Sequence, residues 1–343
     1  MKFFYKFHFK FFLLFFLALT GWKAHSQDIH FSQFYHSPAN LNPALTGVFA
    51  GDYRFIGNYR SQWASVPVPY RTISGSFDAR LQHKFLGNNA FLGYGLVLNN
   101  DLAGDANLGL TQVGVNLAYT RQLSEVLIAS VGVQLMSGQR SIQPDRLAFE
   151  EQWNGDVHDP NLSSNEAFSN SSRGLSSISS GLNLHYQVPG SRTKIDLGTG
   201  IFHLNQPVTT FTDDTDVKLP RKGTAYFFSN FQVHPVLDVK VNALFSRQLT
   251  YQEMMGGAAI RYHLSPEKNK ELALQAGLAF RLKDALIPSV ELQVRNWCAG
   301  ISYDVNYSPF KAATNRQGGL EFFLEYILWK VAAPKEFKAC PIF

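Results

Sequence analysis

The sequence predicts an all-β fold, a transmembrane antiparallel up-and-down β-barrel of about 14 strands. Apolar and polar residues alternate along most of the chain, in segments near the roughly 9–11 residues that a tilted strand needs to cross a bilayer. Aromatic residues recur at the ends of these segments, as in the girdles of such barrels. With 45% hydrophobic residues and a mean hydropathy of −0.11, the chain is neither disordered nor a helical membrane protein.

Residues 1–26 read as a secretory signal peptide. Lys2, Lys6 and Lys10 form a basic region, residues 11–19 form an apolar core, and Ala24-His25-Ser26 is a small-x-small cleavage site. The formal net charge of +5 falls to +1 once the four lysines of this segment are removed. We therefore expect cleavage near Ser26 and no nucleic-acid partner.

Residues 27–50 are expected to form an ordered periplasmic leader. Asn42-Pro43 and Thr46-Gly47 are turn makers. A plain linker is the alternative, but it has no need of aromatic side chains. We therefore predict that the leader folds against, or plugs, the barrel mouth. Its candidate partner-binding residues are Phe31, Phe34, Tyr35, Asn42 and Pro43.

Residues 51–330 carry the alternation. Tyr53, Phe55 and Tyr59 alternate with polar residues such as Arg54 and Asn58, so that one face of the strand is apolar and the other polar. The same pattern recurs over fourteen segments, an even number as single-chain bacterial barrels have. The further segments are Thr72–Leu81, Phe91–Asp101, Leu108–Gln122, Val126–Gln139, Arg173–Gln187, Thr193–Leu204, Thr224–Val233, Leu237–Leu249, Gln252–Leu264, Leu272–Lys283, Ser289–Arg295, Trp297–Val305 and Leu320–Trp329.

The lengths of the connections predict the orientation of the barrel. Such barrels have short periplasmic turns and longer outer loops. The longest gaps, Arg140 to Ser172, Asn205 to Gly223 and Asn306 to Gly319, follow the fifth, seventh and thirteenth segments, so all three fall on one side. Connections after even-numbered segments, such as His234-Pro235 and Arg295-Asn296, are tight. A soluble β-protein also alternates, but its strands are usually shorter.

The sequence contains no recognisable catalytic set. Its 10 histidines are scattered, and neither HExxH nor GxSxG occurs. The acidic run of Asp213, Asp214 and Asp216 has the oxygen ligands that calcium prefers, but it lacks the Gly and the terminal Glu of an EF-hand loop. We expect a solvated acidic loop, no enzyme activity, no cofactor and no metal site.

The loop from Arg140 to Ser172 contains two apolar anchors, Phe149 and Trp153. Loops of more than about 12–15 residues are commonly functional or disordered. A merely solvated loop does not need large apolar side chains. We therefore weigh a protein contact, or a plug folded over the lumen, evenly against a flexible solubilising loop.

Several stretches together resemble the PorP/SprF family of type IX secretion proteins from the Bacteroidota. The resemblance covers the whole mature chain, and its motifs are specific when taken together. They are Gln27 to Tyr35, Asn42 to Gly47, Tyr59 to Trp63, Ser302 to Asn306, Gly319 to Glu321, and Cys340 to Phe343.

The resemblance implies an outer-membrane barrel that works with type IX secretion or gliding. Its partners would be outer-membrane lipid, type IX secretion components and a large secreted adhesin-like protein. It also makes residues 331–343 a periplasmic tail in which Cys340 and Phe343 are candidate contacts. A small-solute channel is the rival function, but it usually needs a charged constriction, and inward-pointing charge is sparse in the pattern. A barrel enzyme such as a lipase would need a Ser/His/acid set that cannot be assembled.

The two cysteines, Cys298 and Cys340, fit neither a zinc knuckle nor a redox CxxC spacing. In the predicted topology both lie near the periplasmic rim, where disulfides persist. A bridge between them requires Cα atoms within roughly 7 Å. The resemblance favours instead a free Cys340 that is available to a partner.

The predicted orientation is tested by cysteine labelling on whole cells. Single cysteines at Ser164, Thr215 and Asn315 are expected to react with an impermeant thiol reagent, because these positions fall in the outer loops. A cysteine at Ser191 is expected to stay unlabelled. Labelling of Ser191 with protection of the other three would reverse the orientation.

Overall fold

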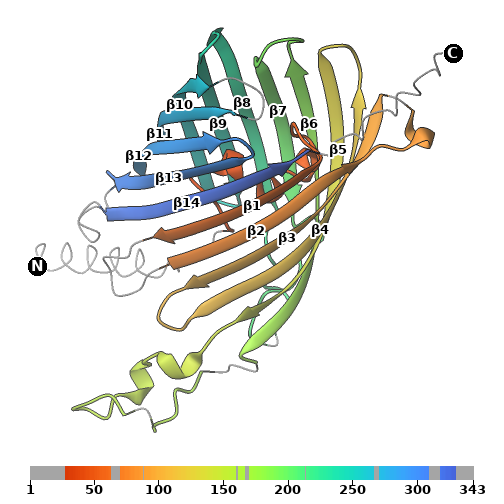
Figure 1. Ribbon diagram of the computed structural model, residues 1–343. Coiled ribbons are helices and arrows are strands. Elements are labelled where there is room, and N and C mark those ends of the chain that lie inside the picture. The colour runs from red at the N-terminus through yellow and green to blue at the C-terminus, as the bar shows by residue number, and fades with distance from the viewer. Residues whose placement is uncertain are drawn as a thin grey trace, which may run out of the picture.

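The fold is a closed antiparallel β-barrel of 14 strands, seen in a computed structural model (Figure 1). The structure describes residues 28–62, 70–87, 89–159, 161–166, 170–212, 214–265, 270–308 and 317–329. The predicted fold class and strand number are confirmed. The strands are β1 (Tyr53–Gln62), β2 (Tyr70–Leu81), β3 (Ala90–Ala103), β4 (Leu108–Gln122), β5 (Leu127–Ser141), β6 (Ser172–Gln187), β7 (Lys194–Phe202), β8 (Lys222–His234), β9 (Leu237–Gln248), β10 (Tyr251–Ser265), β11 (Leu272–Arg281), β12 (Ala285–Val294), β13 (Trp297–Asn306) and β14 (Gln317–Leu328).

Each strand pairs with its neighbours in sequence, and the barrel closes between β1 and β14. Tyr53 at the start of β1 lies opposite Leu328 at the end of β14, and Gln62 lies opposite Gly319. Closure leaves no free sheet edge, which is the condition for a sheet in lipid. No helix among the described residues is long and apolar enough to cross a membrane.

The polarity of the wall is the inverse of that in a soluble protein. On β3, β4, β5 and β6, the side chains of Leu98, Leu117, Leu135 and Leu182 are 54–60% exposed on the outer face. The polar residue beside each of them faces the lumen and is at most 4% exposed. An exposed apolar band around a polar interior is the arrangement expected of a barrel surrounded by lipid. The inward partners are Asn99, Asn116, Gln134 and Asn183.

The three longest connections lie at one end of the barrel, which we call the long-loop end. They join β5 to β6, β7 to β8 and β13 to β14, and the first of them projects well beyond the wall in Figure 1. The other end, called the short-turn end, holds tight turns such as Arg295-Asn296 between β12 and β13. Strand β1 starts from the short-turn end.

Several strand boundaries differ from the prediction by a few residues, and the difference is largest at the start of β12. We expect a strand from Ser289, but β12 starts at Ala285. Pro288 stands inside this strand and opposite Leu278 of β11, whereas the ladder to β13 passes from Leu286 directly to Ser289. Proline lacks the N–H that a ladder requires, so the sequence pattern places the boundary after it, although the strand continues through it.

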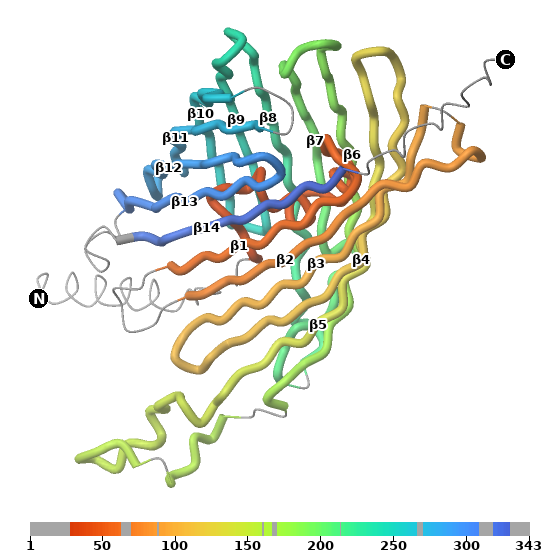
Figure 2. Tube along the Cα trace, in the orientation of Figure 1, coloured from red at the N-terminus to blue at the C-terminus, as the bar shows by residue number. Residues whose placement is uncertain are grey.

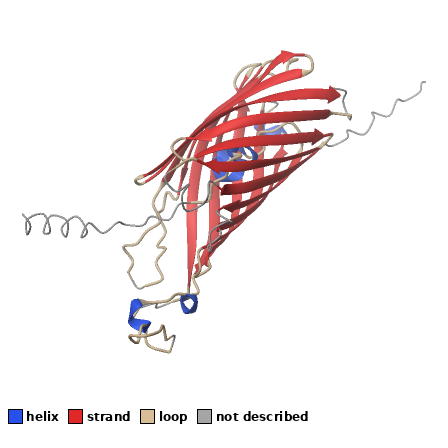
Figure 3. Ribbon diagram, turned by 90° about the vertical axis from the view of Figure 1, so that its left-hand side faces the viewer, coloured by secondary structure: helices blue, strands red, loops and turns tan. Residues whose placement is uncertain are grey.

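The leader, residues 28–50, lies inside the barrel. It forms three short helical turns, η1 (Phe34–His36), α2 (Pro38–Leu41) and η2 (Pro43–Leu45), which are visible within the wall in Figure 3. In Figure 2 the red tube of the leader also lies within the wall. The remaining short helices, η3 (Lys84–Leu86), η4 (Pro144–Arg146) and η5 (Glu150–Gln152), lie in loops.

Candidate functional site

The leader passes through the lumen from the long-loop end to the short-turn end. At the long-loop end, an Asp28 carboxylate oxygen lies 3.0 Å from His203 Nε2 and 3.5 Å from Lys222 Nζ. His203 follows β7 and Lys222 opens β8. Burial alone would raise the pKa of Asp28, but Lys222 and His203 hold it well below its usual range. This end of the leader is therefore held by ionic contacts with His203 and Lys222.

The next residues of the leader are held by carboxylates of β13 and β14. The backbone N–H groups of Ser32 and Gln33 donate to the two oxygens of Glu321 at 2.7 and 2.6 Å. The Ser32 hydroxyl donates to Asp304 at 2.8 Å, and the Gln33 amide donates to Ser302 at 3.0 Å. Hydrogen bonds to ionised acceptors are about twice as strong as neutral ones.

Two arginines balance these buried carboxylates. Arg60 Nη2 and Arg281 Nη1 both lie 3.0 Å from Asp304 Oδ2, and Arg281 Nε lies 3.0 Å from Glu253. Arg60 also donates to the carbonyl of His30 at 2.7 Å. Buried charges are costly unless they are paired and hydrogen-bonded. We expect sparse inward charge from the sequence, and this expectation is wrong because the lumen holds a connected ionic network.

In the middle of the lumen, η1 packs aromatic rings against the wall. The His36 ring stacks on Phe323 with a centroid distance of 3.5 Å, and it lies 3.0 Å from Glu325 and 3.4 Å from Glu291. The Tyr35 hydroxyl donates to Glu291 at 3.1 Å. Burial alone would lower the pKa of the His36 imidazole, but the two carboxylates raise it above its ordinary value.

The apolar residues of the leader fill an apolar patch of the inner wall. Phe34, Leu41 and Leu45 form one buried cluster with residues of β8, β9, β10 and β12. Each such side chain contributes about 1.5–3 kcal/mol when it is fully buried. The wall members of the cluster are Tyr226, Leu244, Met255, Ala285 and Ile287.

Asn42 is the polar centre of the leader and is 0% exposed. Its Oδ1 accepts from the backbone N–H of Ala44 at 2.9 Å, which caps η2. Its Nδ2 donates to the carbonyl of Leu182 and to the hydroxyl of Tyr226, each at 2.8 Å. Pro43 follows in the first turn of η2 and is also buried. The Asn-Pro pair therefore fixes the leader against the wall.

Inward-facing glycines make room for the leader. A Cβ atom at Gly132 of β5 would overlap the backbone of Pro43 and Ala44, and one at Gly181 of β6 would overlap the side chain of Asn42. A Cβ atom at Gly93 of β3 would likewise overlap the carbonyl of Thr46. Only glycine permits this approach of two backbones.

The leader is held again where it joins β1. Arg54 donates to both carboxylate oxygens of Asp78 at 2.8 Å, and the backbone N–H of Gly47 donates to Asp78 at 2.8 Å. Gly47 has a φ of 77°, a conformation that glycine adopts without strain. The Thr46-Gly47 turn predicted from the sequence therefore redirects the chain from the lumen into the wall.

The predicted partner-binding residues separate into three groups. Phe31, Phe34, Tyr35, Asn42 and Pro43 come together in the lumen, where all except the half-buried Tyr35 are buried. We expect the leader at the barrel mouth, and it lies deeper because inward carboxylates and amides supply its hydrogen-bond partners. Phe149 and Trp153 lie in the loop after β5. Cys340 and Phe343, like the signal peptide and the tail, lie outside the described residues.

The loop after β5 carries an exposed apolar tip. Trp153 is 56% exposed and pairs with His158 in an isolated bridge. Gln152 is buried and donates to the carbonyl of Leu162 at 3.0 Å. Phe149 is half-buried, and its backbone N–H donates to Gln152. The loop thus has internal structure while Trp153 faces outward.

The acidic loop after β7 is only partly described. Asp214 accepts from the backbone N–H of Asp216 at 2.8 Å, and Asp213 lies outside the described residues. Over the described ranges, no group of three or more His, Cys, Asp or Glu side chains is placed to hold a metal ion.

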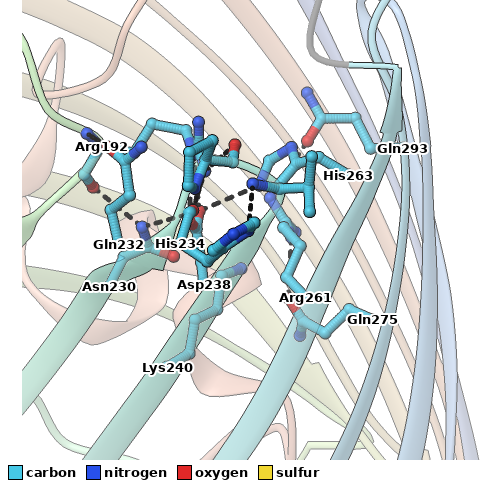
Figure 4. Close-up of polar contacts among 12 residues, drawn as sticks. Arg192, Asn230, Gln232, His234, Asp238, Lys240, Arg261, His263, Gln275 and Gln293 are labelled. Atoms are coloured by element: carbon cyan, nitrogen blue, oxygen red, sulfur yellow. Dashed lines mark hydrogen bonds and ion pairs between the residues drawn. The ribbon is translucent and has the colours of Figure 1, made fainter.

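A cavity of about 400 Å³ opens at the short-turn end between the leader and the strands β7 to β14. Asn230 lines the cavity and is hydrogen-bonded to the buried Asp238 beside it, shown in Figure 4. Arg192 donates to both oxygens of Asp238 at 2.8–3.1 Å, and Asn230 donates at 3.1 Å. His263 Nε2 lies 3.0 Å from the same carboxylate.

Arg261 lines the cavity itself and joins several polar side chains of its wall. It donates to Gln275 and Gln293, each at 3.0 Å, and to Glu291 at 3.2 Å. Lys240 lines the cavity beside it, with its Nζ 4.0 Å from Glu291. The sequence analysis predicted the leader but did not identify these wall residues, because each of them is an isolated polar position in an alternating strand.

The family of the chain follows from a comparison with family models. The model of the type IX secretion system membrane protein PorP/SprF matches residues 23–326. The chain belongs to the PorP/SprF family. The predicted family membership is thereby confirmed. No curated protein matches the chain.

Solved structures with a similar fold are outer-membrane barrels of low sequence identity. The Ralstonia pickettii toluene transporter TbuX is 12% identical, with a TM-score of 0.50 over 83% of this chain and 91% of that one. A deletion mutant of the TodX monoaromatic hydrocarbon channel is 8% identical, with a TM-score of 0.49 over 83% and 92%. A Pseudomonas aeruginosa FadL homologue is 9% identical, with a TM-score of 0.44 over 83% and 92%. The likeness to TbuX supports the fold alone.

The glycine contacts predict that Gly132→Ala displaces the leader. Overpacking of this kind costs typically about 1–3 kcal/mol. The variant is expected to melt at a lower temperature in heat-modifiable gel electrophoresis and to expose the leader to protease. Gly57→Ala is the control, because a Cβ atom there meets nothing within 4 Å. Equal melting and protection in the two variants would contradict the packing.

The ion pairs of His36 predict that leader attachment depends on pH. Because its pKa is raised in the folded barrel, His36 stabilises the leader below its unfolded pKa of about 6.5, and this stabilisation is lost as pH rises through the folded pKa. Protease cleavage of the leader is expected to accelerate at higher pH in wild type but less so in His36→Gln. The control His234→Gln changes an exposed histidine at the end of β8. Identical pH profiles in all three proteins would refute the assignment.

Proposed function

We propose that this PorP/SprF protein is a non-enzymatic outer-membrane component of the type IX secretion or gliding machinery. In this role it aids the export, or the surface anchoring, of a large secreted adhesin-like protein. Its long-loop end faces the cell surface and its short-turn end faces the periplasm, after cleavage of a signal peptide near Ser26.

The observation that carries this proposal is the occupied lumen. The leader fills the barrel from Asp28 to Gly47. It is fixed at one end by the ion pairs of Asp28 with His203 and Lys222, and at the other by the backbone N–H of Gly47, which donates to Asp78. A diffusive pore needs a continuous aqueous path lined by side chains that let solutes leave. A lumen that is filled by its own chain suits a scaffold whose contacts lie at the two ends and on the wall.

A small-solute channel is the alternative function. Two observations favour it: the fold resembles outer-membrane channels, and a cavity of about 400 Å³ lies at the short-turn end. That volume falls within the range of small-molecule sites. The leader separates this cavity from the long-loop end, so passage would require the leader to move.

Deletion of the protein separates the two functions. Growth and small-solute uptake are expected to stay nearly unchanged, while one or a few large proteins disappear from the cell surface. The readouts are quantitative surface proteomics and uptake of labelled solutes. An intact surface proteome together with an uptake defect would favour the channel.

The exposed tip of the loop after β5 is the proposed surface contact. Trp153→Ala is expected to reduce adhesin display without changing barrel melting, because large aromatic side chains dominate protein interfaces. Val157→Ala is the matched control, because this side chain is 58% exposed on the same loop. Wild-type display in the Trp153 variant would remove this residue from the proposed interface.

A further inference from the structure

The cavity at the short-turn end has walls of two kinds. The leader contributes mainly apolar side chains, among them Leu45, Val48 and Phe49. The strands contribute polar side chains, among them Lys240 and Arg261. Its volume of about 400 Å³ is that of a small-molecule site, in which an apolar lining and a few placed polar groups select the ligand.

Arg261 orients two side-chain amides of the strand wall. The amide oxygens of Gln275 and Gln293 accept from Arg261 at 3.0 Å each, as Figure 4 shows. The oxygen of each amide is thereby engaged, and its NH₂ group is left as the donor. No described residue accepts a hydrogen bond from either NH₂ group. Both residues line the cavity, so its wall contains two oriented donors without acceptors.

Lys240 adds a charged donor to this wall. Of the described carboxylates, only that of Glu291 lies within reach of its Nζ, at 4.0 Å, which is longer than a hydrogen bond. Glu291 is already engaged, because it accepts from Arg261 at 3.2 Å and from the Tyr35 hydroxyl at 3.1 Å. The Lys240 ammonium group therefore has no hydrogen-bond acceptor among the described residues.

The carboxylates that line the cavity have other neighbours. Glu325 lies 3.0 Å from His36, and Asp196 lies 2.8 Å from His185. Glu271, the third of them, stands directly before β11. The strand wall thus presents donors whose acceptors the described part of the chain does not supply.

A wall of unpaired donors opposite an apolar surface favours a ligand that carries an acceptor group on an apolar body. A carboxylate matches these donors best, because it only accepts hydrogen bonds, offers about four acceptor sites and carries the charge opposite to that of lysine. Hydrogen bonds between charged groups are also stronger than those between neutral ones.

We propose that this cavity binds an organic carboxylate with an apolar body. The carboxylate contacts Lys240 and the NH₂ groups of Gln275 and Gln293, and the apolar part packs on Leu45 and Phe49. Such a ligand comes from an acidic peptide or from a lipid-derived acid. The site goes beyond the proposed function, since it depends neither on the secreted cargo nor on the side of the membrane that the short-turn end faces.

Isothermal titration calorimetry on the full barrel in lipid nanodiscs tests the binding, with empty nanodiscs as the blank. One arm compares N-acetyl-phenylalanyl-glutamate amide with its neutral glutamine counterpart, and the other compares octanoate with octanamide. Binding of at least one acid, about tenfold or more tighter than its amide, is expected from hydrogen bonds to a charged group. The arm that shows it identifies the source of the ligand. No binding of either acid, or equal binding of acid and amide in both arms, would overturn the proposal.

Substitution of Lys240 separates its direct contact from a structural role. Lys240→Met is expected to weaken binding of the acid about tenfold or more and to remove the preference for acid over amide, whereas Lys240→Arg keeps that preference. Lys283→Met is the matched control, because it removes an exposed lysine from the turn between β11 and β12 at the other end of the barrel. Gel mobility shifts on heating show whether each barrel is folded. An unchanged preference in folded Lys240→Met would overturn the proposal.

Cys298 lines the same cavity and reports where the acid binds. The sequence has two cysteines, so in a Cys340→Ser background Cys298 is the one thiol that methyl methanethiosulfonate modifies. The bound acid is expected to slow this reaction several-fold, and its neutral amide to leave the rate unchanged. An unchanged rate at a saturating concentration of the acid would place the binding elsewhere and overturn the proposal.

Discussion

Pairing of buried charge in the lumen is the constraint on which the rest of the structure depends. A barrel of this polarity turns carboxylates and guanidinium groups inward, and each of them requires a partner once the lumen is filled. Glu321 accepts hydrogen bonds from the backbone N–H groups of Ser32 and Gln33, and Asp304 forms ion pairs with Arg60 and Arg281. Removing one member of such a network leaves the others buried and unpaired, which costs more than the contact itself. The leader therefore supplies hydrogen-bond partners that the inward-facing charged groups of the wall require.

The filled lumen places the interaction surfaces elsewhere on the molecule. The outer face is an apolar band that contacts lipid, and the leader is withdrawn into the interior. What remains available is the long-loop end, where Trp153 projects, and the short-turn end, where Lys240 and Arg261 line a cavity. This division suits the proposed role of a protein that holds partners on two sides of a membrane.

The wall was predictable from the sequence because its information is local. Alternation with a period of two identifies each strand, and the parity of the connections identifies the end to which each loop belongs. The start of β12 was missed because Pro288 looks like a boundary, although its lack of an N–H is tolerated within the strand. The predicted turns at Asn42-Pro43 and Thr46-Gly47 were also local signals, and both occur.

The position of the leader was not predictable in the same way, because its partners are distant in sequence. Ser32 meets Glu321 across 289 residues, and nothing in either segment alone indicates the contact. Inward charge was underestimated for a similar reason, since Arg281 and Asp304 each occur singly in their strands. The glycines that admit the leader, such as Gly132, read as ordinary strand residues until the backbone of Pro43 is placed against them.

Single-channel conductance in a planar lipid bilayer tests most directly whether the leader closes the barrel. Purified wild-type protein is expected to give little or no conductance, because the leader fills the lumen. Glu321→Ala is expected to conduct, at least intermittently, because it leaves the N–H groups of Ser32 and Gln33 without their acceptor. A stable open conductance of the wild-type barrel, equal to that of the variant, would contradict the account.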